Sequence, residues 1–178
     1  MKLGLKRGTV ELYPHDVMWE EKAAETIERL KEILSDTAVD IQHVGSTAIR
    51  GIHAKPILDI AIGVRSFEEI LGKKELLEQN HVIYRGQDHP GQHLFVMGDF
   101  EADTRTHHIH VVLWGGTEWN DYVNFRDYLN AFPEKAAAYH DLKQNLLAGF
   151  AAERGQYTRG KHELIQTLLK EAHAWKNI

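Results

Sequence analysis

The sequence predicts a mixed α/β domain, in which a β-sheet is flanked by helices and followed by a helical C-terminal layer. Two patterns lead to this fold class. Up to about residue 115, apolar segments of strand length alternate with amphipathic helical segments, and the last third is helical throughout. No repeat or flexible linker divides the 178 residues. We therefore expect one domain over 1–178, with a core over about 9–115 and a helical part over about 116–178.

In the first half of the chain, the predicted elements follow from periodicity and capping residues. A short β-like piece spans 10–13, and His15 or Asp16 then caps a helix to about residue 35. Strands are expected over 38–44 and 57–64. Ser66 and Glu69 form a capping box that opens a helix to about residue 79.

The second half supplies three further strands and the C-terminal helices. The strands are expected over 81–84, 93–97 and 107–114, with residues 85–91 forming a loop between the first two. Helices should begin at Thr117, with Pro133 in a first turn, and at Thr158. Two apolar stripes mark these helices: Phe125, Leu129 and Phe132, and Leu142, Leu146 and Phe150. Trp114, Phe125 and Phe132 are assigned to the core.

Composition excludes several classes of protein. With 43% hydrophobic and 26% charged residues, the chain has enough apolar surface to fold without disulfides. The sequence contains no cysteine, which excludes a thiolate metal site. The N-terminal residues lack a signal-peptide pattern, and the strongest apolar run, Ile57 to Val64, is too short to span a membrane. We expect a cytoplasmic protein without a membrane partner.

The net charge of −5 argues against general DNA binding or attraction to anionic lipid. A local basic pocket for a phosphorylated ligand remains compatible with this charge.

The segment from His43 to Ile62 carries the chemistry. A strand stops at Gly45, where the missing Cβ would let a ligand approach the backbone. Ser46 or Thr47 can cap a short helical turn whose N–H groups would face phosphate. On the next strand, Asp59 interrupts an apolar run, and a buried carboxylate is costly unless it is paired or binds metal. Asp59 is therefore the strongest candidate functional residue.

The segment resembles the nucleotidyltransferase superfamily, in which a Gly-Ser turn precedes a strand bearing Asp-x-Asp or Asp-x-Glu. Over nearly its full length the chain more closely resembles the GrpB family, also called UPF0157. The matching positions are Tyr13-Pro14, Trp19, His43-Val-Gly-Ser-Thr-Ala48, Gly51, Ala54-Lys-Pro56, Asp59-Ile60, His108-Ile-His-Val111, Phe125-Arg-Asp-Tyr-Leu129, Tyr139-x-x-Leu-Lys143, Tyr157 and Lys161. The resemblance implies a nucleotidyltransferase-like fold.

One departure from the superfamily pattern bears on catalysis. Ala61 stands where the second carboxylate is expected, so two-metal transfer is hard to support. Asp59 alone could hold one Mg²⁺ with the help of substrate phosphates. His108 and His110, on a later strand, suit Mn²⁺, Ni²⁺ or Zn²⁺ better than Mg²⁺. The candidate metal ligands are therefore Asp59, His108 and His110, and the candidate catalytic residues are Asp59 and His110.

Structural interpretations stand beside these functional ones. Asp59 could instead pair with Lys55 or Arg50, and the histidines could be ordinary strand residues among the chain's twelve. Arg126 is expected to form a salt bridge to Asp127 or to a neighbouring helix rather than to contact a ligand. Lys143, Arg154, Arg159 and Lys161 form either a basic rim over the pocket or a solvated helical face.

Three functions remain open. The leading hypothesis is binding of a nucleotide or another phosphorylated small molecule, with nucleotidyl or phosphoryl transfer if a divalent metal is held. The residues expected to contact phosphate are Gly45, Ser46, Thr47, Lys55, Lys143 and Lys161. The second hypothesis is a non-catalytic accessory domain, because GrpB-like domains also occur fused to dephospho-CoA kinase. The third is a histidine-rich transition-metal enzyme, such as a hydrolase, on the same scaffold.

Overall fold

The computed structural model describes residues 1–150 and 159–177 and confirms a mixed α/β fold around a five-stranded sheet. The strand order is β2-β3-β7-β5-β4, in which β3 and β7 are parallel and the other neighbours are antiparallel. A second sheet pairs β1 with β6. The strands are β1 (Leu5–Lys6), β2 (Ala38–Val44), β3 (Leu58–Val64), β4 (Ile83–His89), β5 (Gln92–Met97), β6 (Thr104–Arg105) and β7 (His107–Leu113).

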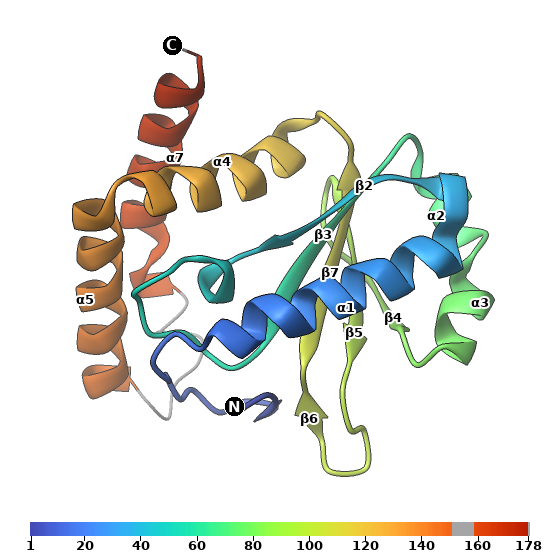
Figure 1. The fold of residues 1–178 in the computed structure, drawn as a ribbon, viewed down its shortest axis with the longest axis horizontal. Helices are drawn as coiled ribbons and strands as arrows, with labels where there is room; N and C mark the ends of the chain where they lie inside the picture. The colour runs from blue at the N-terminus through green and yellow to red at the C-terminus, as the bar shows by residue number, and fades with distance from the viewer. Residues whose placement is uncertain (151–158, 178) are drawn as a thin grey trace.

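Helices cover the sheet on both faces (Figure 1). α1 lies across one face, and α5 and α7 stand together beyond one side of the sheet. The helices are α1 (Val17–Leu34), α2 (Phe67–Leu71), α3 (Lys74–Gln79), α4 (Thr117–Ala131), α5 (Pro133–Phe150) and α7 (His162–Lys176), with short 3₁₀ turns η1 (Ser35–Thr37) and η2 (Ser46–Ala48). None of the helices in the described ranges is long and apolar enough to cross a membrane.

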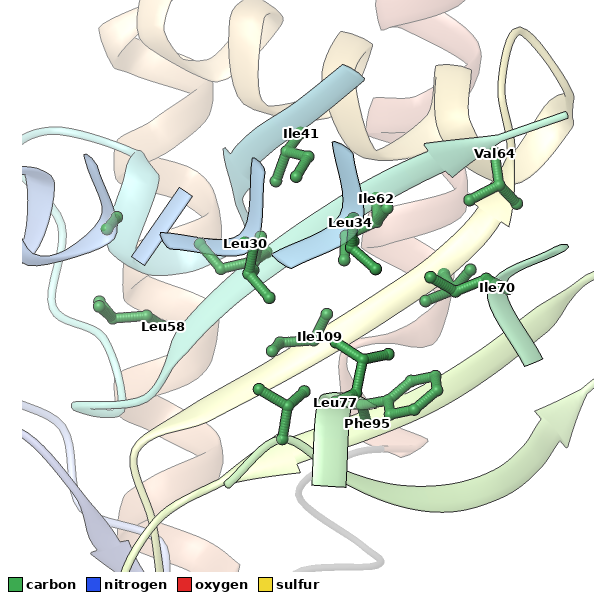
Figure 2. Close-up of a cluster of buried hydrophobic side chains, with 14 of the residues drawn as sticks. Leu30, Leu34, Ile41, Leu58, Ile62, Val64, Ile70, Leu77, Phe95 and Ile109 are labelled. Atoms are coloured by element: carbon green, nitrogen blue, oxygen red, sulfur yellow. The ribbon is translucent and has the colours of Figure 1, made fainter. Parts of the chain in front are cut away.

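The main core lies between the sheet and the layer formed by α1, α2 and α3 (Figure 2). Alternation along β3 sends its apolar side chains into this core, as the sequence predicts. The β3 residues in the core are Leu58, Ile60, Ile62 and Val64, and all four are buried. The opposite face of β3 carries Asp59 and then the fully buried Ala61, which packs with Trp119 of α4.

A second core holds the C-terminal helices together and ties them to the loop between β2 and β3. Tyr128 and Leu129 of α4 and Leu168 of α7 pack there with Ile49 and Ile52. The helical layer is therefore anchored to the segment that follows the Gly45–Ser46 turn.

The structure corrects several predicted boundaries. β4 extends through Arg85 to His89, so the segment interpreted as a loop is mostly edge strand, closed by a turn at Pro90-Gly91. Residues 10–13 contribute only an isolated bridge between Tyr13 and Ala54. The helix predicted from Ser66 to Gln79 is two helices, α2 and α3.

The cap of α4 is Gly116 rather than Thr117, which is the first residue of the helix. Trp114 was assigned to the core but is 54% exposed. Pro133 does open α5. Phe125 and Phe132 pack against the second core, as predicted. The predicted cap at Thr158 lies outside the described residues, as does the side chain of Phe150.

Candidate functional site

Asp59 and two histidines meet on one face of the sheet. Asp59 of β3 lies opposite His108 of β7 in the parallel register. Its Oδ1 atom is 3.0 Å from Nε2 of His110 and 3.5 Å from Nδ1 of His108. Asp59, His108 and His110 therefore lie on the same face of the sheet. Arg50, the alternative partner, pairs with Glu20 instead.

The surroundings of Asp59 keep its carboxyl group ionised. Burial acts to raise the pKa of Asp59, but hydrogen bonds from His108 and His110 outweigh burial and hold that pKa well below its usual value. The side chain of Asp59 is still 27% exposed, so it remains accessible from the cavity described below. Asp59 is therefore an accessible anion held in place by two imidazoles.

Gly45 has a different function from the one predicted. It has φ of +70°, and a Cβ added there would lie 2.5 Å from Oδ2 of Asp59. The side chain that approaches the Gly45 backbone is thus the Asp59 carboxylate itself, rather than a ligand. The missing side chain at Gly45 makes room for Asp59.

The turn after Gly45 is present but is not capped as predicted. η2 spans Ser46–Ala48, and its N-cap is Gly45, without a side-chain hydrogen bond. Ser46 lines the cavity, and its hydroxyl lies 3.4 Å from that of Tyr139. Thr47 is buried, and its hydroxyl lies 2.9 Å from Nε2 of His43. The structure therefore places Ser46, but not the Thr47 side chain, where a ligand could reach it.

Lys143 is the least expected feature of the site, because it is only 2% exposed and not on a solvated helical face. Its Nζ donates to the backbone carbonyl of His53 and lies 4.6 Å from the ring centre of Tyr139. Burial, together with the nearby charges of Lys161 and Lys55, lowers the pKa of Lys143 to about 7. An anion beside Lys143 would favour its charged form.

All the candidate residues except Gly45 and Thr47 line one cavity of about 450 Å³, which we call the Asp59 cavity. Its walls come from the β2–β3 connection, β3, β7, α4, α5 and the start of α7. The polar and ionisable residues in these walls are Ser46, Lys55, Asp59, His108, His110, Tyr122, Lys143 and Lys161.

A second space of about 500 Å³, the α4–α7 cleft, adjoins the Asp59 cavity. Five residues line both spaces: Ser46, Asp59, His110, Tyr122 and Lys161. Aromatic and apolar side chains of three helices contribute to the walls of the cleft: Tyr122, Phe125, Tyr139, Ile165 and Leu169. The site thus has a lysine-rich end and a more apolar end, with Asp59 in both.

Two tyrosines in this site were not singled out as site residues from the sequence. The Tyr122 ring lies 4.9 Å from that of His110, and its hydroxyl donates to Gln92 over 2.6 Å. Tyr139 is one helical turn before Lys143, and residues four apart share a helix face, so this pairing was open to prediction. The Tyr122–Gln92 contact joins α4 to β5 and carries no local sequence signal.

The donor set at Asp59 does not form a metal site by itself. Among residues 1–150 and 159–177, no three His, Asp or Glu side chains are arranged to hold a metal ion. Both histidines direct a ring nitrogen at the same oxygen of Asp59, where an N–H from each can donate to the carboxylate. A metal ion would need ligands from a bound phosphate, so metal binding by Asp59, His108 and His110 stays a prediction.

The structure also shows the surroundings of Arg126 and of the predicted basic rim. Arg126 pairs with Asp127 over 2.7 Å, as predicted, and also donates to the carbonyl of His43. This ties α4 to the end of β2. Arg154 lies outside the described residues, and Arg159 is exposed and lines neither space, so Lys143 and Lys161 are the residues of the predicted basic rim that line the Asp59 cavity.

The architecture is that of a nucleotidyltransferase-like fold. It is similar to the Cid1 poly(U) polymerase in its MgGTP-bound crystal structure, with a TM-score of 0.50 and 11% identity. That similarity covers 77% of this chain and 44% of the polymerase chain. At this identity the likeness concerns the fold alone.

Within this fold class, the chain belongs to the GrpB family, whose model, described as "GrpB protein", matches residues 9–171. It is 36% identical over 172 residues to the glutamate-rich protein GrpB of Alkalihalophilus pseudofirmus, covering 95% of this chain and 99% of that one. The crystal structure of conserved protein GrpB from Enterococcus faecalis aligns with a TM-score of 0.83 and 28% identity, covering 91% of this chain and 96% of that one. A dephospho-CoA kinase of Mycolicibacterium paratuberculosis is 26% identical over 96% of this chain, which spans 48% of that protein.

Proposed function

We propose that this protein binds a nucleotide or another phosphorylated small molecule, with its phosphates in the Asp59 cavity. The observation that carries the proposal is the convergence of Lys55, Lys143 and Lys161 on the cavity that contains Asp59. Phosphate is the common small-molecule group that several lysines hold together.

The burial of Lys143 supports this choice of ligand. A buried ammonium group is costly unless it is paired, and two other lysines line the same cavity. A phosphate group would offset these charges at once. The carbonyl of His53 already orients the Lys143 ammonium group, so little side-chain entropy would be lost on binding.

The α4–α7 cleft supplies a place for the rest of the molecule. Phe125 and Tyr139 contribute aromatic surface, and Ile165 and Leu169 contribute apolar surface. A nucleobase or a similar flat apolar group fits such a lining. The two connected spaces therefore suit a molecule with a charged end and a more apolar end.

The negative charge of Asp59 requires the phosphorylated ligand to bind together with a cation. Its carboxylate is ionised and lines the same cavity as the proposed phosphates, so a positive charge has to lie between them. A single divalent ion, held by Asp59 and the phosphates, meets this need. If transfer takes place, His110, whose Nε2 lies 3.0 Å from Asp59, is the candidate acid–base residue.

The buried Ala61 favours a second candidate function, a binding or accessory domain that does not turn its ligand over. Ala61 is fully buried and packs with Val44, Val112 and Trp119, so the position of the second carboxylate is filled by apolar core. The binding chemistry of this alternative is the same, and only product formation differs. A histidine-based hydrolase would need Zn²⁺ or Mn²⁺ at His108 and His110.

Calorimetric titration with the four ribonucleoside triphosphates, each with Mg²⁺, tests the proposal. We expect at least one to bind, and Lys161→Gln to weaken that binding by about tenfold, because one charge-assisted contact is lost. Lys170→Gln, at an exposed position of α7, the helix that Lys161 precedes, is the matched control and should leave the affinity unchanged.

Failure of all four to bind, or equal effects of the two variants, would reject the nucleotide form of the proposal. Phosphorus NMR of the incubated mixture then separates the two candidate functions. New phosphorus signals that depend on Asp59 indicate transfer, and an unchanged spectrum with intact binding indicates a binding domain.

A further inference from the structure

A second basic cavity lies at the end of the molecule where β1 pairs with β6. Its volume is about 200 Å³, and five lysine and arginine residues line it: Lys6, Arg7, Lys55, Arg85 and Arg105. No aspartate or glutamate of the described ranges is among the lining residues. In a chain with a net charge of −5, this concentration of positive charge favours an anionic ligand.

Arg105 gives this cavity a fixed cation rather than a flexible surface charge. It is only 7% exposed, and its guanidinium lies 4.7 Å from the ring centre of Phe100. Its ion-pair partner in the described structure is Asp103, at 3.4 Å, and Asp103 is itself half exposed. The pairing of Leu5 with Arg105 in the β1–β6 sheet places Lys6 and Arg7 next to it. Nη1 of Arg105 also donates to the carbonyl of Thr104 over 2.9 Å, and these two contacts leave other N–H groups of the buried guanidinium for a planar anion.

The apolar residues of the same cavity limit what the ligand can be. Leu5, Ile57, Leu94 and Val96 form its apolar surface, and Leu5 and Val96 are buried. A phosphate that carries a sugar or another small carbon group fits this combination better than a fully hydrated inorganic ion.

The two cavities share walls. Lys55 and His108 line both this cavity and the Asp59 cavity, as does Ile57. A basic surface thus continues from Lys143 and Lys161, past Asp59, to Arg105. Seven lysine and arginine residues line the two cavities, and Asp59 is the one acidic residue in the part of their lining that the structure describes. This positive charge is enough for more than one phosphate-bearing group.

We infer that the cavity around Arg105 is a second phosphate subsite, joined to the Asp59 cavity, so that the protein holds two separate phosphate groups at once. The second phosphate comes either from the far end of one long ligand, such as an oligonucleotide, or from a second phosphorylated molecule. The subsite itself stands on Arg105 and the β1–β6 sheet, and only its joint use with the Asp59 cavity rests on the proposed function.

NMR of the side-chain Nε–H groups of arginine tests the subsite directly, with inorganic pyrophosphate as the probe. We expect pyrophosphate to shift the Arg105 signal. The double variant Arg7→Ala, Arg85→Ala should weaken this response by at least about tenfold, because both side chains are exposed and line the cavity. Lys31→Ala, Lys73→Ala removes the same charge from exposed Lys31 and half-buried Lys73, which line neither cavity, and should have no effect beyond about twofold.

Two further ligands identify the source of the second phosphate. If one molecule spans both subsites, a 5′-phosphorylated dinucleotide binds more tightly than the mononucleotide, and the Arg7→Ala, Arg85→Ala variant loses that advantage. If two molecules bind, pyrophosphate shifts Arg105 equally with and without mononucleotide. An Arg105 signal unmoved by pyrophosphate, or equal losses in the two double variants, overturns the inference.

The test separates this inference from the proposed function. If nucleotide binding depends on Lys161 but pyrophosphate does not shift the Arg105 NMR signal, the proposed function stands and the second subsite is rejected. A shift of the Arg105 signal by pyrophosphate, without any nucleotide binding, supports the second subsite and rejects the nucleotide form of the proposed function.

Discussion

At Gly45 and Asp59, two residues from neighbouring strands depend on each other for their positions. The carboxylate of Asp59 occupies the space where a side chain at position 45 would lie. Both residues could be found from the sequence, since a glycine ends one strand and an acid interrupts the next. Their contact could not be found there, because it depends on the antiparallel register that sets Val44 opposite Asp59.

Gly45→Ala tests this dependence. A Cβ would be strained at φ of +70° and would push Asp59 away from His108 and His110. We expect a loss of about 1–3 kcal/mol in the free energy of unfolding, measured with urea, and loss of metal-dependent nucleotide binding. Gly51→Ala, at φ of +77° but with open space around its Cβ, is the control for backbone strain alone. Binding losses of equal size in both variants would contradict the contact as the cause.

Lys143 gives a prediction about pH. Its pKa is lowered to about 7 from 10.5, so between these values the unfolded chain keeps a proton that the folded chain has released. The free energy of unfolding should therefore rise with pH across this window, by about 2 kcal/mol from pH 7 to 9, and the gain is lost again as pH falls to 7. In urea unfolding at both pH values, Lys143→Met should lack this rise. Parallel pH profiles for the two proteins would show that Lys143 titrates normally.

At the scale of elements, β3 and β7 were predictable and β4 was not, for one physical reason. β3 and β7 are central, so burial imposes an apolar face with a period of two. β4 is an edge strand whose residues from Arg85 onward are mostly exposed, so Arg85 to His89 have the composition of a loop. Likewise, the burial of Lys143 depends on how α5 packs, and nothing in its helical neighbourhood indicates it.

The two faces of β3 should respond differently to substitution. Ile60 is fully buried in the main core, so Ile60→Ala should cost about 2–5 kcal/mol in the free energy of unfolding. Asp59→Asn should cost less than about 1.5 kcal/mol, because the amide oxygen can still accept a hydrogen bond from His110. Chemical denaturation of both variants measures this difference. If Asp59→Asn is as destabilising as Ile60→Ala, then Asp59 is a structural partner of the histidines rather than a functional acid.

At the scale of the whole molecule, the site lies where two cores meet. The sheet provides Asp59 and the histidines, and the C-terminal helices provide Tyr139, Lys143 and Lys161. Ile49 and Ile52 join the helical layer to the β2–β3 connection, which also carries Ser46. Periodicity predicted both layers, but it carries no information about which helix face closes over Asp59. The family resemblance was the indication that these helices line the site, because its matching positions include Lys143 and Lys161.

This arrangement predicts that metal and nucleotide depend on each other. Asp59 repels phosphates unless a cation lies between them, and no described set of three side chains holds an ion alone. We expect Mg²⁺ or Mn²⁺ to bind weakly by itself, and each partner to tighten the other by the same factor, of about 5–150-fold. Calorimetric titrations in both orders measure the two factors independently, and unequal factors would mean that a second site is being titrated.

Asp59→Asn distinguishes the origin of this coupling. Without the carboxylate charge, the nucleotide should bind with little dependence on metal, because the repulsion is gone while Lys143 and Lys161 remain. Persisting dependence in Asp59→Asn would place the ion elsewhere. Tight metal binding by the apo protein that weakens below about pH 6.5 would instead show that His108 and His110 are ligands, since histidine must be neutral to bind a metal.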